Sequence, residues 1–138
     1  MVTDRKLKLR IVSPEAVLLE EEVASVTFPG EDGLFGVLPR HAAMLSLSES
    51  GKLSARMADG TMLEFVVHDG FVEVRNDQIT VLTRSAERPQ DIDADRAREA
   101  GERAKVRLRG TKEEVDLIRA QAALKRALVR QRYAETRV

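Results

Sequence analysis

The sequence predicts a mainly β protein with a helical end: an N-terminal antiparallel β-sandwich over residues 1–86, then a C-terminal two-helix antiparallel hairpin over residues 87–138. Short stretches of alternating apolar and polar residues fill the first part, as in strands with one buried face. Turn sequences recur about every ten residues there, which favours an antiparallel meander. Residues 93–137 contain no Pro and only two Gly, so this part is predicted to be helical.

The first strands follow an alternation of apolar side chains. Leu7, Leu9 and Ile11 alternate with basic residues, which predicts a strand with one apolar face. Glu20–Glu22 interrupt the next apolar series as a turn or an exposed edge. The members of that series are Val17, Leu19, Val23, Val26 and Phe28.

Three tight connections are predicted in the later part of the sandwich, at Asp59-Gly60, Asp69-Gly70 and Asn76-Asp77. Such pairs suit type I′ turns, which need positive φ at both central residues. All four Phe lie in the N-terminal part, so the main core is expected there. The connections separate the predicted strands Lys52–Arg56, Met62–His68, Phe71–Arg75 and Ile79–Leu82.

The helical part predicts two closely packed helices. Gly110 is expected at a left-handed C′ position that ends the first helix. Thr111 and Glu114 form a capping box that starts the second. A stripe of mostly small residues lets the helices approach: Ala97, Ala100, Gly101, Ala104 and Leu108.

The second helix carries apolar residues on two faces, which packing on a single helix does not satisfy. Either one face packs on the first helix and the other on the sandwich, or the helix changes partners. One face has Val115, Ile118, Ala122, Val129 and Tyr133, and the other has Leu117, Leu124 and Leu128.

Composition excludes several classes of protein. With 33% charged residues and no long apolar run, the chain has no membrane span, and no apolar region marks a signal peptide. It has no Cys, which excludes disulfides and thiolate chemistry. Residues 1–86 have a net charge of −4 and residues 87–138 one of +4. The basic tail suits an anionic partner, such as nucleic acid, a nucleotide or an acidic protein surface, or is simply a solvated face.

A loop from Pro29 to Ala42 has three Gly and two Pro in fourteen residues, which implies several fixed turns. It contains His41, and the only other His is His68, within an apolar strand. Two isolated His do not make a metal site, so we expect no metal and assign both a structural role.

Two motifs together resemble one family. They are the run Ile92-Asp93-Ala94-Asp95-Arg96-Ala97, where strands give way to helices, and the Gly-rich loop from Pro29 to Ala42. In this order and separation they resemble the epsilon subunit of F-type ATP synthases, over essentially the whole chain.

The resemblance implies a non-catalytic rotor subunit in the central stalk of a proton-translocating ATP synthase. It would contact the membrane rotor c-ring through Glu31, Asp32 and Leu34, and the gamma subunit through the face with His41. Its helices would leave the sandwich, enter the catalytic head and inhibit ATP hydrolysis, their cations meeting acidic loops of the beta and alpha subunits. The implied location is peripheral, on the cytoplasmic face of a bacterial plasma membrane.

The resemblance also implies a regulatory ATP site, with no cofactor required. Ile92 and Asp93 would lie near the adenine and the arginines near the phosphates, since guanidinium groups match phosphate oxygens. The charge of Asp95 beside Arg96 is expected to weaken phosphate binding. No Gly-rich phosphate loop with Lys is present, so the site would sense ATP without hydrolysing it. The matching positions are Glu87, Ile92, Asp93, Arg96, Ala97, Arg103, Arg126 and Arg130.

Two other functions fit parts of the sequence. A nucleic-acid-binding β-module with a basic helical tail predicts exposed aromatic residues on the sheet, whereas the four Phe lie at largely core-like positions. A small hydrolase needs a nucleophile with its base, or paired carboxylates, and the sequence shows neither arrangement.

Overall fold

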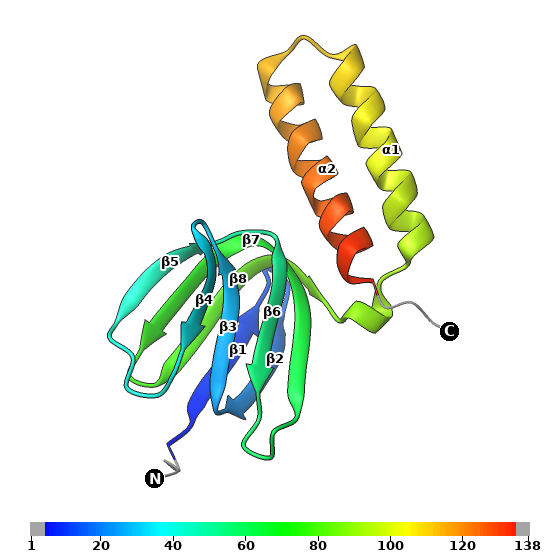
Figure 1. The fold of residues 1–138 in the computed structure, drawn as a ribbon. Helices are drawn as coiled ribbons and strands as arrows, with labels where there is room; N and C mark the ends of the chain where they lie inside the picture. The colour runs from blue at the N-terminus through cyan, green and yellow to red at the C-terminus, as the bar shows by residue number, and fades with distance from the viewer. Residues whose placement is uncertain (1–4, 135–138) are drawn as a thin grey trace. The chain divides into compact units, whose positions relative to one another are not determined.

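The computed structural model describes residues 5–134 and divides the chain into two compact units, Met1–Glu87 and Arg88–Val138 (Figure 1). The first unit contains the strands and the second the helices. The predicted fold class, a β-sandwich followed by two helices, is confirmed. No helix among the described residues is long and apolar enough to cross a membrane.

The described part of the first unit is built from eight strands. They pair in the order β2-β1-β8-β7-β5-β3-β4, while β6 pairs with β3 and β7. β1 and β8 are parallel, and the other pairs are antiparallel. The strands are β1 (Leu7–Val12), β2 (Val17–Val23), β3 (Ser25–Gly30), β4 (Gly33–Val37), β5 (Met44–Ser48), β6 (Gly51–Arg56), β7 (Met62–Arg75) and β8 (Gln78–Glu87).

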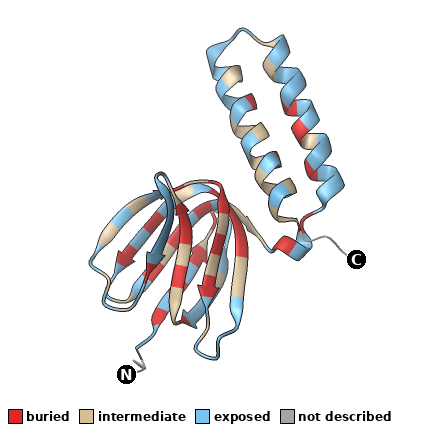
Figure 2. Cartoon of the chain, in the orientation of Figure 1, coloured by how far each residue is buried: buried red, intermediate tan, exposed pale blue. Residues whose placement is uncertain are grey.

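The sandwich core is formed by side chains that alternate along the strands (Figure 2). In β1, Leu7, Leu9 and Ile11 are at most 1% exposed, while Lys8 and Arg10 between them face solvent. Each such burial contributes about 1.5–3 kcal/mol, so these positions dominate the stability of the unit. The rest of the core comprises Val23, Val26, Phe28, Val37, Leu53, Ala55, Phe65, Val67, Val72, Val74, Ile79 and Val81.

The Phe residues mark the core only in part. Phe28 and Phe65 are buried, but Phe35 and Phe71 are 36% and 48% exposed. Phe71 pairs across the sheet with Leu47 and Leu82, which are also exposed. The expectation that the Phe positions are core-like is therefore wrong for two of the four.

Strand β7 corrects the predicted turn at Asp69-Gly70, because it continues through this pair from Met62 to Arg75. Its first half pairs with β6 in one layer of the sandwich, and its second half pairs with β5 in the other layer. β7 therefore runs through both layers. Gly70 is needed there for another reason: a Cβ on it would lie 1.8 Å from the Leu82 carbonyl oxygen. The glycine serves the close approach of β8.

The other two predicted turns are present, but the predicted type I′ geometry is wrong for Asp59-Gly60, because Asp59 does not have positive φ. Asn76 and Asp77 have φ of 50° and 58°, as a type I′ turn requires, and join β7 to β8. Gly60 has a φ of 89° in the turn between β6 and β7. There the Asp59 carboxylate accepts a hydrogen bond from Thr61 N–H, which lowers the pKa of Asp59.

In the second unit, a short 3₁₀ turn, η1 (Pro89–Asp91), precedes the helices α1 (Ala94–Gly110) and α2 (Glu114–Tyr133). Ala97, Gly101 and Ala104 of α1 are buried, as the small-residue stripe predicts. A Cβ on Gly101 would lie 3.5 Å from the Cβ of Ala127, so the helices approach closely at this point. Ala100 and Leu108 are half-buried at the margin of the contact.

The predicted signals between the two helices are wrong in detail. Gly110 is the last residue of α1 and does not have positive φ. Thr111 is the C-cap of α1, and its N–H donates to Arg107 O. The N-cap of α2 is Glu113, without a side-chain hydrogen bond, so the capping box does not form. Because α1 runs to Gly110, Thr111 is taken up as its C-cap, and α2 begins two residues later than the box would place it.

Candidate functional site

The motif at the start of the helices has clear structural roles in the second unit. The Asp93 carboxylate accepts a hydrogen bond from Arg96 N–H at 3.0 Å, which makes Asp93 the N-cap of α1. Ile92 and Ala97 are buried. The motif thus fixes where α1 begins.

Asp95, in the first turn of α1, has a second arginine nearby besides Arg96. Its Oδ1 lies 3.4 Å from Nη2 of Arg98, in an exposed pair one turn apart on α1. The guanidinium group of Arg98 therefore partly balances this carboxylate. The charge of Asp95 is expected to weaken phosphate binding at Arg96 less than its position in the sequence suggests.

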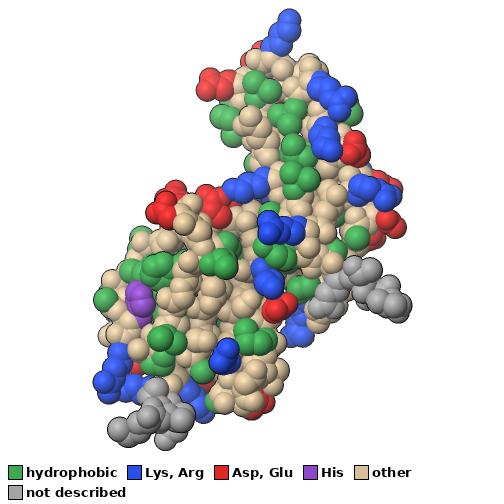
Figure 3. Space-filling model, viewed as in Figure 1, with side chains coloured by type: hydrophobic (Ala, Val, Ile, Leu, Met, Phe, Trp, Pro, Cys, Tyr) green, Lys and Arg blue, Asp and Glu red, His purple; other side chains and the backbone are tan. Residues whose placement is uncertain are grey.

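The predicted phosphate-binding arginines lie on both helices. Arg103 follows Gly101 by two residues, and Arg126 directly precedes Ala127, which lies opposite Gly101. The two arginines therefore occupy the same level of the hairpin, with Arg130 one turn further along α2. Figure 3 shows Lys and Arg side chains along the helical unit. Arginines at one level repel one another unless they separate into water or an anion neutralises them.

Exposure differs between the two helices. Arg96 and Arg103 of α1 are exposed, whereas Arg126 and Arg130 of α2 are half-buried. The half-buried arginines are the better placed to hold an anion, because a charged contact is screened less when it is partly removed from water.

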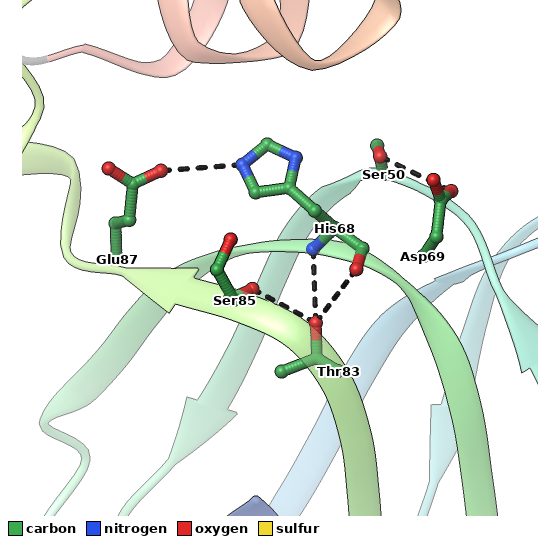
Figure 4. A network of polar contacts seen from close by, with 6 residues as sticks. All are labelled: Ser50, His68, Asp69, Thr83, Ser85 and Glu87. Carbon is green, nitrogen blue, oxygen red and sulfur yellow. Dashed lines mark hydrogen bonds and ion pairs between the residues drawn. The ribbon is translucent and has the colours of Figure 1, made fainter. Parts of the chain in front are cut away.

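Glu87 belongs to the first unit, as the last residue of β8. Its Oε1 lies 3.3 Å from Nε2 of His68, a fully buried side chain of β7 (Figure 4). Thr83 Oγ1 accepts from His68 N–H at 3.1 Å, and lies 3.0 Å and 2.9 Å from the carbonyl oxygens of His68 and Ser85. This network fits the structural role predicted for His68. The contact with Glu87 was missed, since nineteen residues separate the two in sequence.

The predicted contact residues of the sandwich lie around β4. Glu31 and Asp32 are exposed at the tip of the β3–β4 hairpin, and Leu34 is 76% exposed. His41 is half-buried, with its ring 5.6 Å from that of Phe35 in an edge-to-face arrangement. The tip is thus available to a partner, whereas His41 is partly occupied within its own unit.

A solvent-open cavity of about 510 Å³ lies where the two helices connect. It involves none of the predicted nucleotide-binding residues. No three His, Asp or Glu side chains within residues 5–134 are grouped to hold a metal ion. The cavity is lined by Arg107, Gly110, Thr111, Asp116, Arg119 and Ala120.

Comparison with known proteins assigns the family. A model of the beta-sandwich domain of the ATP synthase Delta/Epsilon chain matches residues 6–89, and one of its long alpha-helix domain matches residues 90–135. The chain belongs to the ATP synthase epsilon family. The resemblance noted from the two motifs is therefore confirmed. As a member of this family, the chain is a subunit of an ATP synthase, without a catalytic role of its own.

Curated relatives and solved structures agree. The ATP synthase epsilon chain of Nitratidesulfovibrio vulgaris (strain DP4) is 49% identical over 129 residues, covering 94% of this chain and 96% of the relative. That of Syntrophobacter fumaroxidans is 45% identical over 130 residues, with 94% and 96% covered.

The fold recurs in two mitochondrial ATP synthase structures. One is from Euglena gracilis (TM-score 0.78, 23% identity, 90% of this chain and 78% of that chain covered). The other is a central stalk and c-ring structure from Tetrahymena thermophila (TM-score 0.71, 12% identity, 97% and 100% covered). At these identities the likeness shows the fold.

Proposed function

We propose that this epsilon-family chain is a rotor subunit of the central stalk, and that its helical unit inhibits ATP hydrolysis and senses ATP. The sandwich would join the gamma subunit to the rotor ring, on the cytoplasmic face of a bacterial plasma membrane. The exposed hairpin tip, with Glu31, Asp32 and Leu34, supports the ring contact. His41 has the weaker support, since its ring already contacts Phe35.

The observation that carries the inhibitory role is apolar surface left open on α2. Val115 and Ile118 are 60% and 58% exposed, and Leu128 is 48% exposed. These side chains come from both predicted apolar faces, so packing on α1 leaves each face partly uncovered. Such surface suits a helix that exchanges partners, and nearby cations would direct it to an acidic surface.

A reconstituted ATP synthase tests this role. Replacing Arg126, Arg130 and Arg132 with Ala should raise ATP hydrolysis about tenfold, since each exposed contact contributes ~0.5 kcal/mol. The control replaces Arg98, Lys105 and Arg109 of α1, which removes the same charge from positions without a proposed contact. Equal hydrolysis by the wild type and the first variant, with both incorporated, would refute the inhibitory role.

The proposed ATP site uses residues of the helical unit, with Arg103 and Arg126 at one level and Arg130 one turn further along α2. ATP is a polyanion whose phosphate oxygens accept hydrogen bonds from several guanidinium groups at once. Binding between α1 and α2 would neutralise the mutual repulsion of the arginines and hold the hairpin closed. ATP would then oppose release of the helices, which links the sensing of ATP to inhibition.

A further inference from the structure

Several exposed charges on this chain are balanced by a neighbour of opposite sign. Glu20 and Glu22 of the edge strand β2 pair with basic residues of β1, so the alternative of an exposed edge is right for these acids. On α1, Arg98 and Lys105 each pair with an acid one turn away. The charges around the cavity at the helix connection are different.

Three charged side chains line this cavity without being paired. Arg107, Asp116 and Arg119 form no ion pair with any side chain among residues 5–134. Asp116 and Arg119 lie three residues apart on α2, a spacing that suits an ion pair, yet they do not pair with each other. Two guanidinium groups and one carboxylate are therefore available to a ligand.

The helix ends explain only part of this arrangement. Arg107 lies in the last turn of α1 and Asp116 in the first turn of α2, where the helix dipoles favour a cation and an acid respectively. Arg119 lies in the second turn of α2, where this effect has faded. Two arginines at one cavity repel each other unless an anion neutralises them.

The cavity has room for a ligand. Its volume of about 510 Å³ is typical of ligand-binding cavities, which measure roughly 300–1,000 Å³. A Cβ on Gly110 would meet no atom within 4 Å, so the backbone at this point is open to the cavity. Thr111 also lines the cavity, and its hydroxyl group forms no hydrogen bond within the described part of the chain, which leaves one more donor for a ligand.

We propose that this cavity binds hydrogen phosphate, with Arg107 and Arg119 donating to its oxygens and Asp116 accepting a hydrogen bond from its P–OH group. Guanidinium groups match phosphate oxygens, whereas a carboxylate only accepts hydrogen bonds and repels an anion that has no acidic hydrogen. Inorganic phosphate keeps such a hydrogen near neutral pH and sulfate does not, so the site should select phosphate.

Bound phosphate would hold the connected ends of α1 and α2 together. Since phosphate is a substrate of ATP synthesis, the helical unit would then respond to a signal distinct from ATP. The phosphate site shares no residue with the proposed ATP site, so neither site depends on the other.

A titration of the full chain with inorganic phosphate, followed by amide NMR, measures this binding. Phosphate should shift the amide signals of Gly110 and Thr111 until they saturate. Sulfate should bind about tenfold more weakly, because it gives Asp116 no hydrogen bond. Asp116→Asn removes the repelling carboxylate and should bring the affinities for the two anions within about twofold of each other.

The arginines are tested against a matched control. Arg107→Ala and Arg119→Ala should each weaken phosphate binding about tenfold. Arg109→Ala should leave it within about twofold of wild type, because Arg109 is exposed in the same turn of α1 but does not line the cavity. Equal losses in all three variants would mean that phosphate is attracted only by the general positive charge, and would overturn the site. Amide signals that do not saturate, or equal binding of sulfate and phosphate by the wild type, would overturn it as well.

Discussion

Asp93 is the residue at which a structural and a ligand-binding role can be separated. Its carboxylate caps α1 through Arg96 N–H, and the family resemblance also assigns it to the adenine. Asn caps a helix as well as Asp does, whereas Ala at the N-cap lowers the stability of the folded protein by about 1 kcal/mol. We expect Asp93→Asn to melt like wild type without ATP but to lose most of the stabilisation that ATP provides. Asp93→Ala should melt at a lower temperature without ATP and should also lose the stabilisation by ATP. Circular dichroism melting measures this, and an undiminished ATP effect in Asp93→Asn would show that the residue is only a cap.

Arg103 and Arg126 test the phosphate side of the same site. ATP at a hundredfold excess over its Kd should stabilise the folded hairpin by about 2.7 kcal/mol. Each arginine would supply a charged contact of roughly 1.5–3 kcal/mol, so replacing either with Ala should remove most of the gain. Arg98→Ala is the matched control, because Arg98 is an exposed arginine of α1 paired with Asp95. Equal shifts of the melting curve in all four proteins, or none in wild type, would exclude this site.

At the scale of the element, Gly70 has the most restrictive position on β7. A methyl group there would overlap the Leu82 carbonyl and force β8 away. We expect Gly70→Ala to reduce the free energy of unfolding by about 3 kcal/mol, at the upper end for overpacking. Gly36→Ala is the control, since its Cβ meets no atom within 4 Å. Urea unfolding of both variants measures the difference, and similar losses would mean that β8 adjusts readily.

The same glycine explains what the sequence predicts and what it does not. Asn76-Asp77 was predicted correctly because a type I′ turn depends on the φ angles of its own two residues. Asp69-Gly70 is also a pair of turn-favouring residues, but Gly70 instead allows β8 to approach at Leu82, twelve positions further along the chain. The neighbouring residues do not show which of the two pairs forms a turn. The capping box predicted at Thr111 and Glu114 does not form for a similar reason, because its formation depends on where α1 ends.

The candidate site was predictable in composition but not in geometry. The family resemblance selects the residues, and helical periodicity places Arg126 and Arg130, four residues apart, on one face of α2. The capping of α1 by Asp93 is local, since its partner Arg96 lies three residues on, whereas the contact of Glu87 with His68 spans nineteen residues and depends on three-dimensional packing. Contacts between residues far apart in the sequence leave no local pattern. The cavity where the two helices connect was not predicted either, because it depends on how the helices pack.

At the scale of the whole molecule, the sandwich should fold without the helices, since all of its core residues lie between Leu7 and Val81. β8 ends at Glu87, and Ala86 and Glu87 pair with β7, so the fragment to test is residues 1–88. We expect it to unfold in a single urea transition and to retain binding to the gamma subunit in a pull-down. The full chain is the control. A fragment that is unfolded, or folded but unable to bind, would reject the division of roles between the two units.

The passage of β7 through both layers has a mechanical consequence. A sandwich whose layers meet only through side chains can shear or open along that plane, but here one continuous strand pairs with β5, β6 and β8. Torque applied to one layer is carried into the other along covalent bonds and the hydrogen bonds of a shared strand. The amides in the middle of β7 should consequently exchange only when the whole unit opens. A body of this construction moves as one piece, which is what the proposed role as a rotor subunit requires.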